Sequence, residues 1–448
     1  MAQLRRINVA SEPMLHGLLK LAWPSVISML LQTVYNLIDT FWLGKLGKIA
    51  ISAPTIAWNI IFFFISLGSG LSVAGLALVS QYTGAQEHDR ASFIAGQVIS
   101  VTFLLSLVIG ILGGLFTDTL LRLLQIPPEL IPQTAIYMKT ILFGMPFTFL
   151  MFAFNSLFSG LGDTFTPMLL TLVSVSLNAV LDPLMIFGIG FPRMEVFGAA
   201  LATVISRGIV LVIAMVLLLR NKVSLKLKPR YLLPHWHEVV RILKVGIPSS
   251  LGQSVTALAF VFITSMIAGF GAVATSAVGV GNRVTSFATM FSFGLSQANS
   301  TMVGQYLGAD MEHRAFRVVW LSFALNMLVV GTICVLTFFF GEQITALFIN
   351  EPEVLVEGRR YFSIVSLSIP FFASFAIFDS ALRGSGHTVQ SMILNILRLW
   401  AIRLPIIYLF GQALGIVGIW YAMLISNLAI CTLAGIVILR KKWLQRVI

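Results

Sequence analysis

Charged side chains are scarce in this sequence: they make up 10% of the 448 residues, against 58% hydrophobic ones. A soluble protein carries about 25% charged residues, so this chain could not cover a water-exposed surface of its size. Cysteine is almost absent, and Cys334 and Cys431 both lie in apolar stretches, which excludes a disulfide framework and a thiolate metal site. The solvent of this protein is therefore the lipid bilayer.

Common enzyme motifs are missing as well. The sequence contains no GxxxxGKS/T, no HExxH and no GxSxG. It therefore carries no P-loop for ATP hydrolysis and neither the zinc-protease nor the serine-hydrolase signature. We expect a protein that is not an enzyme and that needs no cofactor.

Long apolar runs dominate what is present. A helix that crosses a bilayer needs about 20 mostly apolar residues, and uncharged runs near that length recur along the chain, separated by glycine, proline and charge clusters. They predict an all-α polytopic membrane protein. The twelve transmembrane helices are expected at residues 18–43, 52–80, 92–117, 132–157, 165–190, 197–219, 242–267, 279–304, 317–340, 358–382, 389–411 and 414–438.

The net charge of +12 is explained by loops rather than by a nucleic-acid partner. Basic residues gather at the N-terminus (Arg5, Arg6), at the C-terminus (440–446) and in the segment 220–244 after the sixth helix. Twelve spans place these three segments on one side, and Lys and Arg are enriched on the cytoplasmic side. We predict a multi-pass protein of the cell membrane with both termini in the cytoplasm.

The chain matches itself at a shift of 224 residues. Residues 79–91 align with 303–315, with seven of thirteen identical, and Pro24 falls on Pro248. Duplication of this kind is typical of transporters. It predicts two six-helix bundles related by a pseudo-two-fold axis along the membrane normal. We expect an N-terminal lobe at 1–219, a basic cytoplasmic linker at 220–241 and a C-terminal lobe at 242–448.

Polar residues follow one face of the first predicted helix, at i, i+3, i+4 and i+7. They are Gln32, Tyr35, Asn36 and Asp39. In the fifth helix, Asn178 and Asp182 share a face, and Pro183 can bend the helix beside them. Acids inside a span are costly and more often functional than structural. A carboxylate that fastens two helices by hydrogen bonds is the structural alternative.

Neither acid has an acidic counterpart in the second half. Asp39 meets Ile263 at the shift of 224, and Asp182 meets Ile406, or Leu404 if the register has begun to slip. Acids that only fastened the fold would be expected in both halves. The asymmetry therefore favours ion coupling in the first lobe.

Other ionisable residues admit more than one interpretation. Asp379, near the end of the tenth helix, can line a cavity or pair with Arg383. Basic residues inside predicted spans either snorkel to an interface or face a cavity. They are Lys139, Arg207, Arg283, Arg398 and Arg403. His235 and His237 lack a third ligand nearby, which favours an interfacial anchor over a metal site.

Taken together, these motifs resemble the multidrug and toxic compound extrusion (MATE) family over essentially the whole chain. The resemblance rests on Pro24 with the stripe from Gln32 to Asp39, on Gln81-Tyr-x-Gly84 and Gln305-Tyr-x-Gly308, on Asn155 with the Gly-x-Gly-Asp163-Thr that follows it, and on Asn178-x-x-x-Asp182-Pro183. It implies a cation-coupled exporter of amphipathic, often cationic, compounds. The NorM-like branch carries an acid in the seventh helix, whereas Val245–Asn282 contains none, so the sequence looks closer to the DinF-like branch.

The resemblance also assigns roles to residues. By motif, Asp39, Asn178, Asp182 and Thr203 would form the cation or proton site. Gln32, Tyr35, Asn36 and Asn155 would line the drug site. No metal site is expected beyond Na⁺ binding at Asp39, Asn178 and Asp182, because carboxylate and amide oxygens suit a hard cation.

The resulting hypothesis is a monomeric multidrug antiporter that works by alternating access and binds small amphipathic or cationic drugs. A carboxyl group in a desolvated cavity can take a proton near neutral pH, which favours H⁺ over Na⁺ as the coupling ion. A lipid or lipid-linked oligosaccharide flippase of the same superfamily is the alternative, and it would need arginines that face the cavity. A non-transporting membrane enzyme is disfavoured, because no nucleophile–base or metal constellation is visible.

Overall fold

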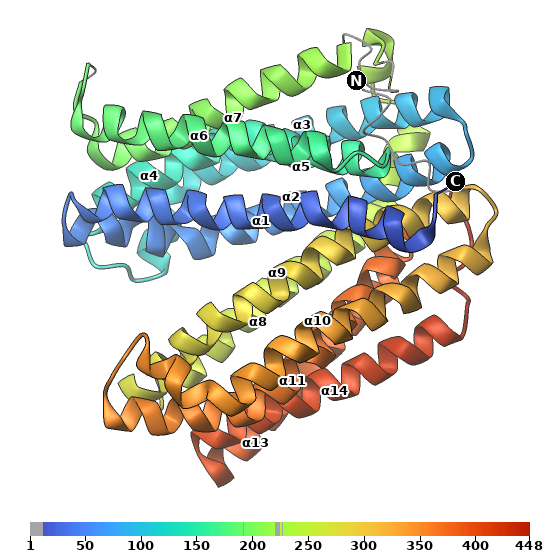
Figure 1. Ribbon diagram of the computed structural model, residues 1–448. Helices are drawn as coiled ribbons and strands as arrows, with labels where there is room; N and C mark the ends of the chain where they lie inside the picture. Colours follow the sequence, from blue (N-terminus) through green and yellow to red (C-terminus); the bar gives the residue numbers. More distant parts are fainter. Residues whose placement is uncertain (1–11, 191, 220–224, 226) are drawn as a thin grey trace. The chain divides into compact units, whose positions relative to one another are not determined.

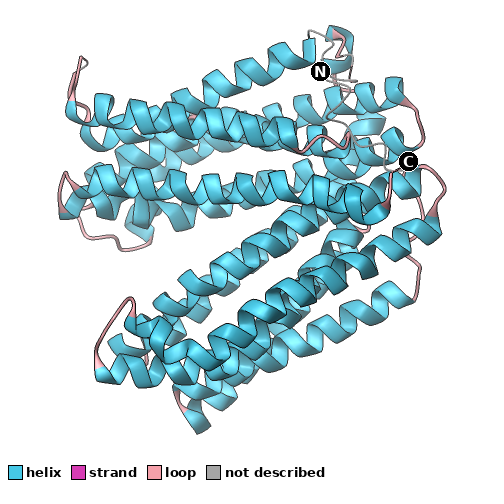
Figure 2. Cartoon of the chain, viewed as in Figure 1, coloured by secondary structure: helices cyan, strands magenta, loops and turns pink. Residues whose placement is uncertain are grey.

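The computed structural model describes residues 12–190, 192–219, 225 and 227–448. Within this part, helices are the regular structure and no strand occurs (Figure 2). The first half contains α1 (Met14–Gly44), α2 (Lys48–Gly84), α3 (His88–Leu123), α4 (Ile131–Phe143), α5 (Met145–Gly160), α6 (Phe165–Phe187) and α7 (Glu195–Leu219). The second contains α8 (Trp236–Ala268), α9 (Ala272–Gly308), α10 (Glu312–Ala346), α11 (Pro352–Gly384), α12 (Thr388–Ile396), α13 (Leu404–Leu414) and α14 (Ile416–Leu439). Five basic residues used in the charge argument, Arg5, Arg6, Arg220, Lys222 and Lys226, lie outside the described residues.

The all-α membrane fold with twelve spans is confirmed. Ten helices of the described chain are long and apolar enough to cross a bilayer, and the bent pair α4–α5 makes an eleventh. The twelfth is α9, which has 37 residues but carries many glycine, serine and threonine residues and is therefore less hydropathic. Most of the observed helices extend past the predicted bounds, because helices continue through the polar residues that flank an apolar core; α6 instead ends three residues before its predicted end, and α14 begins two residues after its predicted start.

Two of the predicted spans are not single continuous α-helices. The fourth is bent by 48° between α4 and α5. Gly144 lies at the bend, Pro146 follows it without an amide hydrogen, and Val204 of α7 packs where a Gly144 side chain would be. In the eleventh span, α12 and α13 are joined by a π-helical segment, η3 (Leu397–Arg403). Such segments are rare and often occur at functional sites.

The chain forms two compact units, and their boundary lies inside two helices. The first unit is Ile27–Ser250, and the second combines residues 12–26 with Leu251–Ile448. Val26 and Ser250 are 224 residues apart, so α1 and α8 are divided at equivalent positions of the repeat. Each lies two residues after a proline, Pro24 in α1 and Pro248 in α8.

Glycines in the second helix of each repeat make room for the segment that comes from the other half of the sequence, namely the start of α8 in the first unit and the start of α1 in the second. A Cβ at Gly70 would overlap backbone atoms of Gly246 and Ser250 in the first unit. At the equivalent position of the second unit, a Cβ at Gly294 would lie 2.9 Å from the backbone nitrogen of Val26. Close packing is therefore the role of Gly70, and it is repeated in both units.

Each unit has its own apolar core. In the first, α2, α3, α4 and α5 pack on one another, and α6 runs beside α7 (Figure 1). Phe149, fully buried, occupies the space left by Gly68. In the second, α11 packs against α9, α10 and α14 (Figure 1). There the buried Tyr361 and Trp420 rings meet edge to face at 4.9 Å between centroids.

The connection after α7 is part of the first unit. Buried Gln97 of α3 donates from Nε2 to the carbonyls of Tyr231 and Leu233, at 2.7 and 2.8 Å, and its Oε1 accepts from the amide of His235 at 2.7 Å. The His235 ring also meets Phe93 at 5.0 Å. The end of the linker is therefore held to α3 by a buried amide.

Candidate functional site

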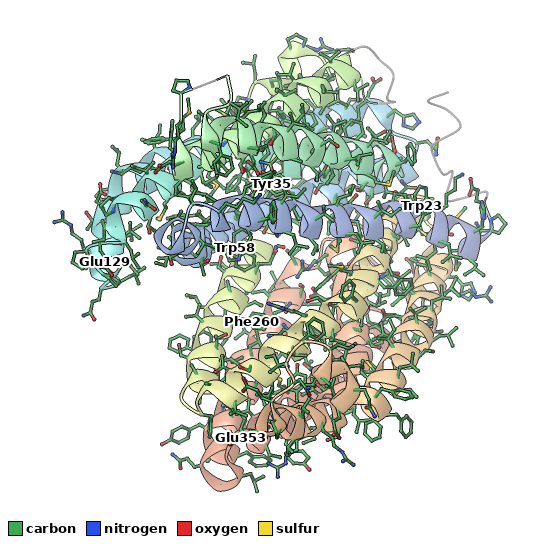
Figure 3. The ribbon with its side chains drawn as sticks, turned by 60° about the vertical axis from the view of Figure 1, so that its left-hand side comes forward. Trp23, Tyr35, Trp58, Glu129, Phe260 and Glu353 are labelled. Atoms are coloured by element: carbon green, nitrogen blue, oxygen red, sulfur yellow. The ribbon has the colours of Figure 1, made fainter. Side chains whose placement is uncertain are left out.

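The polar stripe of α1 divides into an inner and an outer set. Tyr35 is buried, at 4% exposure, and Asp39 is half-buried, whereas Gln32 and Asn36 are exposed. Figure 3 shows Tyr35 on the inner side of α1, among the helices of the first unit. An α-helix turns by 100° per residue, so a stripe of this width reaches both the interior and the edge. Only Tyr35 and Asp39 enter the interior of the unit.

The second acid comes from α6. Asn178 and Asp182 are both fully buried, and Asn178 Nδ2 donates to Asp182 Oδ1 at 3.0 Å. Their spacing of four residues stacks them on one face. Pro183, inside α6, removes one backbone donor directly after the carboxylate. The helix is thus locally weakened at the acid.

Asp39 and Asp182 meet inside the first unit. Their carboxyl groups face each other within hydrogen-bonding reach, and Asn178 lies within reach of both. Oδ1 of Asp39, Oδ2 of Asp182 and Oδ1 of Asn178 are buried and receive no hydrogen bond from a described residue. Buried polar atoms are normally satisfied. Three acceptors without a donor, on side chains that contact one another, form a place where a proton or a small cation would supply what is missing.

Residues of α7 and α5 border this pair. Tyr35 donates through its hydroxyl to Thr203 Oγ1 at 2.8 Å. Arg207 donates to Thr148 Oγ1 at 2.7 Å, and its guanidinium lies 5.8 Å from the centre of the Tyr35 ring. Arg207 is also the basic group that acts on Asp39. The acids therefore share their interior with one guanidinium.

The predicted cation-site residues are thus near one another, in two linked sets. Asp39, Asn178 and Asp182 make direct contact, and Thr203 joins them through Tyr35. Asn155 on α5 is half-buried, and its Oδ1 is likewise without a donor in the described chain. Sequence reasoning missed Thr148 as a partner of Arg207. A serine or threonine that faces a buried arginine has no signal in a single sequence.

Metal ligands of the usual kinds do not cluster. Among the described residues there is no group of three or more His, Cys, Asp or Glu side chains that could hold a metal ion. A monovalent cation at the acid pair would rest on two carboxyl groups and the amide oxygen of Asn178. The two carboxyl groups are enough to hold a proton, whereas a metal ion would need these and additional oxygen ligands.

The two buried acids of the second unit, Glu357 and Asp379, already have partners. Asp379 lies 2.8 Å from Arg383 Nη2 and accepts hydrogen bonds from Ser391 and Asn395. Glu357 accepts from the Trp420 indole at 3.0 Å. Pairing of Asp379 with Arg383 was one of the two expectations, and it is the arrangement observed. Ile263, the counterpart of Asp39, is buried among apolar residues.

Basic residues inside the spans have different surroundings. Lys139 pairs with Asp118, Arg283 is exposed, and Arg207 is held as described above. Arg398 and Arg403 are buried in the second unit. Snorkelling thus suits Lys139 and Arg283 but not the two arginines of η3.

Twelve membrane spans in a repeated arrangement, with converging buried acids in one unit, define a polytopic membrane transporter rather than an enzyme. The MatE family model matches residues 24–184 and again residues 248–409, once in each repeat. The chain therefore belongs to the MatE family of multidrug efflux transporters.

Relatives cover nearly the whole chain. The probable multidrug resistance protein YoeA of Bacillus subtilis is 31% identical over 404 residues, which are 89% of this chain and 87% of that protein. The FAD transporter of Shewanella oneidensis is 26% identical over 94% of both chains. The structure of the Vibrio cholerae MATE transporter VcmN in the bent form has the same fold, with a TM-score of 0.88, 23% identity, and coverage of 96% of this chain and 97% of that one.

Proposed function

We propose that this protein is a cation-coupled antiporter that exports amphipathic organic compounds by alternating access. The observation that carries the proposal is the contact between Asp39 and Asp182, with buried oxygens that lack a donor. Two carboxylates in contact repel each other when both are charged, and one proton between them turns the repulsion into an O–H···O hydrogen bond. Binding of the coupling ion to this pair is the step that drives export of the compound.

Protons are favoured over sodium as the coupling ion. A proton satisfies the pair with the two carboxyl groups alone, whereas sodium would also draw on Asn178 and further oxygens. Each positive charge that moves inward across the membrane gains about 2.3 kcal/mol per 100 mV. Binding at the pair would shift α6 beside Pro183 and move α1, the helix that carries Gln32, Tyr35 and Asn36, three of the residues proposed for the drug.

The drug-binding residues proposed are Gln32, Tyr35, Asn36 and Asn155. Gln32 and Asn36 are exposed on the same helix that buries Asp39, and Asn155 keeps an acceptor without a donor in the described part of the chain. Compounds bound there would lie within one or two helical turns of the coupling pair. The hydrogen bond from Tyr35 to Thr203 would transmit the presence of a bound compound to α7.

Coupling in the first unit alone corresponds to the DinF-like arrangement. The interior of α8 has no acid, since Glu238 lies in its first turn, beside Arg241 at 3.6 Å. The buried acids of the second unit, Glu357 and Asp379, have partners, whereas the Asp39–Asp182 pair keeps carboxylate oxygens without a donor in the described chain. The flippase alternative needs a basic lumen. In the described chain the guanidinium that borders the acid pair, Arg207, is taken up by Thr148 and Tyr35, and the two buried arginines of η3 belong to the second unit.

We further propose that the protein acts as a monomer in the cytoplasmic membrane, with both termini in the cytoplasm. Its partners are small molecules and the bilayer, not nucleic acid. The relatives named for multidrug resistance and for FAD transport together indicate that amphipathic compounds of different charge are candidate substrates.

The test is efflux of a cationic dye from proteoliposomes, first with an imposed proton gradient and then with a sodium gradient alone. We expect transport with the proton gradient. Asp39→Asn, Asp182→Asn and the double variant should each lose at least tenfold in rate, to a similar extent, because one shared site is destroyed in each. Asp118→Asn is the matched control: it removes the same charge in the same unit, from a half-exposed pair with Lys139. Near-additive losses, or transport with sodium alone, would contradict the proton-coupled pair.

A further inference from the structure

Two buried arginines lie in the π-helical segment of the second unit. Arg398 is 3% exposed and Arg403 is 6% exposed, and both belong to η3. Residues five apart share a face in a π-helix, whose hydrogen bonds run from i to i+5. The charge of Arg398 acts on Arg403, which agrees with this placement. The π-helical segment thus carries two buried guanidinium groups that are close enough for their charges to interact.

Neither guanidinium has a carboxylate partner of its own. Arg403 donates from Nε to Ser426 Oγ at 2.8 Å and from Nη2 to Asn427 Oδ1, both neutral acceptors. Arg398 lies over the rings of Phe372 and Phe375, 5.0 Å from each centre, and donates no hydrogen bond to a described residue. Its Nε is buried without an acceptor.

Charge balance around this segment is positive. The nearest carboxylate that acts on Arg398 is Asp379. Asp379 is already held by Arg383 at 2.8 Å and by Ser391 and Asn395. Arg383 and Arg398 therefore share one carboxylate, and Arg403 has none, since Glu357 is held elsewhere by Trp420. A buried charge without a partner is strongly unfavourable. An anion with two oxygens matches the fork of the Arg398 guanidinium, and Arg403 adds a second positive charge beside it.

We propose that Arg398 and Arg403 form an anion site that recognises a carboxylate or phosphate group on the transported compound. The inference rests on the proposed transport function and narrows its substrate class. Phe372 is half-buried beside Arg398, so an aromatic or apolar body attached to the acidic group would pack on an adjoining ring. Substrates of this transporter would then include amphipathic acids or zwitterions, which the site prefers to simple cations of the same shape.

Binding is tested with two fluorescent dyes that differ in one group, a rhodamine with a free carboxylate and its methyl ester. Purified protein in neutral detergent, free of added lipid, is titrated with each dye and binding is followed by anisotropy. The carboxylate dye should bind at least tenfold more tightly than the ester. Arg398→Gln should abolish this preference and leave ester binding unchanged, and Arg398→Lys should restore part of it, because lysine keeps the charge but not the fork.

Arg359→Gln is the matched control, because Arg359 is an exposed arginine of the same unit, 3.5 Å from Glu342. Retained ester binding shows that Arg398→Gln is folded, and Arg403→Lys supplies a second variant if it is not. Equal affinity of the wild-type protein for both dyes would overturn the anion site. So would an equal loss for both dyes in a folded Arg398→Gln variant.

Transport separates this inference from the proposed function. In vesicles of phosphatidylcholine, proton-driven transport of the ester should survive Arg398→Gln, whereas Asp182→Asn should stop transport of both dyes and leave the carboxylate preference in binding. Loss of the preference with intact transport would refute the anion site alone. If phosphatidylglycerol displaces the carboxylate dye more strongly than inorganic phosphate or benzoate does, the site belongs to an anionic lipid headgroup, and the assignment to the substrate is wrong.

Discussion

An added methyl group at Gly70 tests the exchange of helix segments between the two halves of the sequence. A Cβ on this residue of α2 would come closer than 3.0 Å to the carbonyl oxygen of Gly246 and the amide nitrogen of Ser250. Both are backbone atoms of α8, so relief requires movement of the helix rather than rotation of a side chain. Overpacking of this kind costs about 1–3 kcal/mol.

Two smaller terms act in opposite directions. Movement of α8 lengthens the 2.6 Å hydrogen bond from Ser250 Oγ to the Leu67 carbonyl. Hydrogen bonds in membrane proteins contribute about 0.6 kcal/mol on average. Alanine, in turn, stabilises a helix over glycine by about 0.5–1 kcal/mol. The balance predicts that Gly70→Ala lowers the free energy of unfolding by about 1–3 kcal/mol, and Gly294→Ala should act in the same direction.

The assay is unfolding by sodium dodecyl sulfate in mixed micelles, followed by far-ultraviolet circular dichroism. Gly279→Ala is the matched control, because this exposed glycine of α9 has nothing within 4 Å of its Cβ. Only the helix-propensity gain applies there, so the control should be stabilised by about 0.5–1 kcal/mol. If Gly70→Ala is as stable as Gly279→Ala, α8 does not approach α2 as described.

Two further predictions concern single residues or contacts. The Tyr35–Thr203 hydrogen bond is 2.8 Å long and buried, and it should contribute a coupling energy of about 0.5–1.5 kcal/mol. A double-mutant cycle of Tyr35→Phe and Thr203→Val in the same unfolding assay measures this energy, and additive losses would show that the bond contributes nothing. Burial lowers the pKa of His387, in the turn before α12, below its ordinary value of 6.5, so the unfolded chain binds the proton more readily than the folded one. Stability should therefore be full above pH 6.5 and fall as the pH drops below it, and His387→Gln should flatten that slope in thermal unfolding curves; an unchanged slope would exclude His387 as its source.

Helix number and repeat could be predicted from the sequence, because bilayer thickness sets the length of an apolar run. The repeat extends to backbone detail. Gln86 and Asp310, 224 residues apart, both adopt positive φ, at 63° and 57°. Gly162 and Gly386 do the same, at 82° and 83°. The match of the sequence to itself predicts turns at equivalent positions, because the chain must reverse direction at the same places in each repeat.

What could not be predicted depends on contacts between distant segments. Periodicity placed Gln32 and Asp39 on one face, but only packing decides that Asp39 turns inward and Gln32 does not. The η3 segment changes the helical repeat locally, so an α-helical wheel misplaces Arg398 relative to Arg403. Proximity of Asp39 and Asp182 came from family resemblance, because nothing in the spacing of α1 and α6 residues sets their separation.

The division of α1 and α8 at equivalent positions bears on how the chain is made. Residues 12–26 are made early in synthesis, yet they belong to the second unit, where Val26 packs against Gly294 of α9. The first unit becomes complete only when Ser250 has been made, well beyond the connection at 220–241.

Translation at about 5–20 residues per second then leaves the N-terminal turns of α1 waiting roughly 10–40 s after Ser250 for the rest of their unit. During that interval they are a membrane helix segment without its final neighbours. A cut within 220–241 would separate two polypeptides, neither of which contains a whole unit, since each carries the segment that completes the other. The two halves of the sequence are repeats, but each compact unit of the protein contains a segment from both halves.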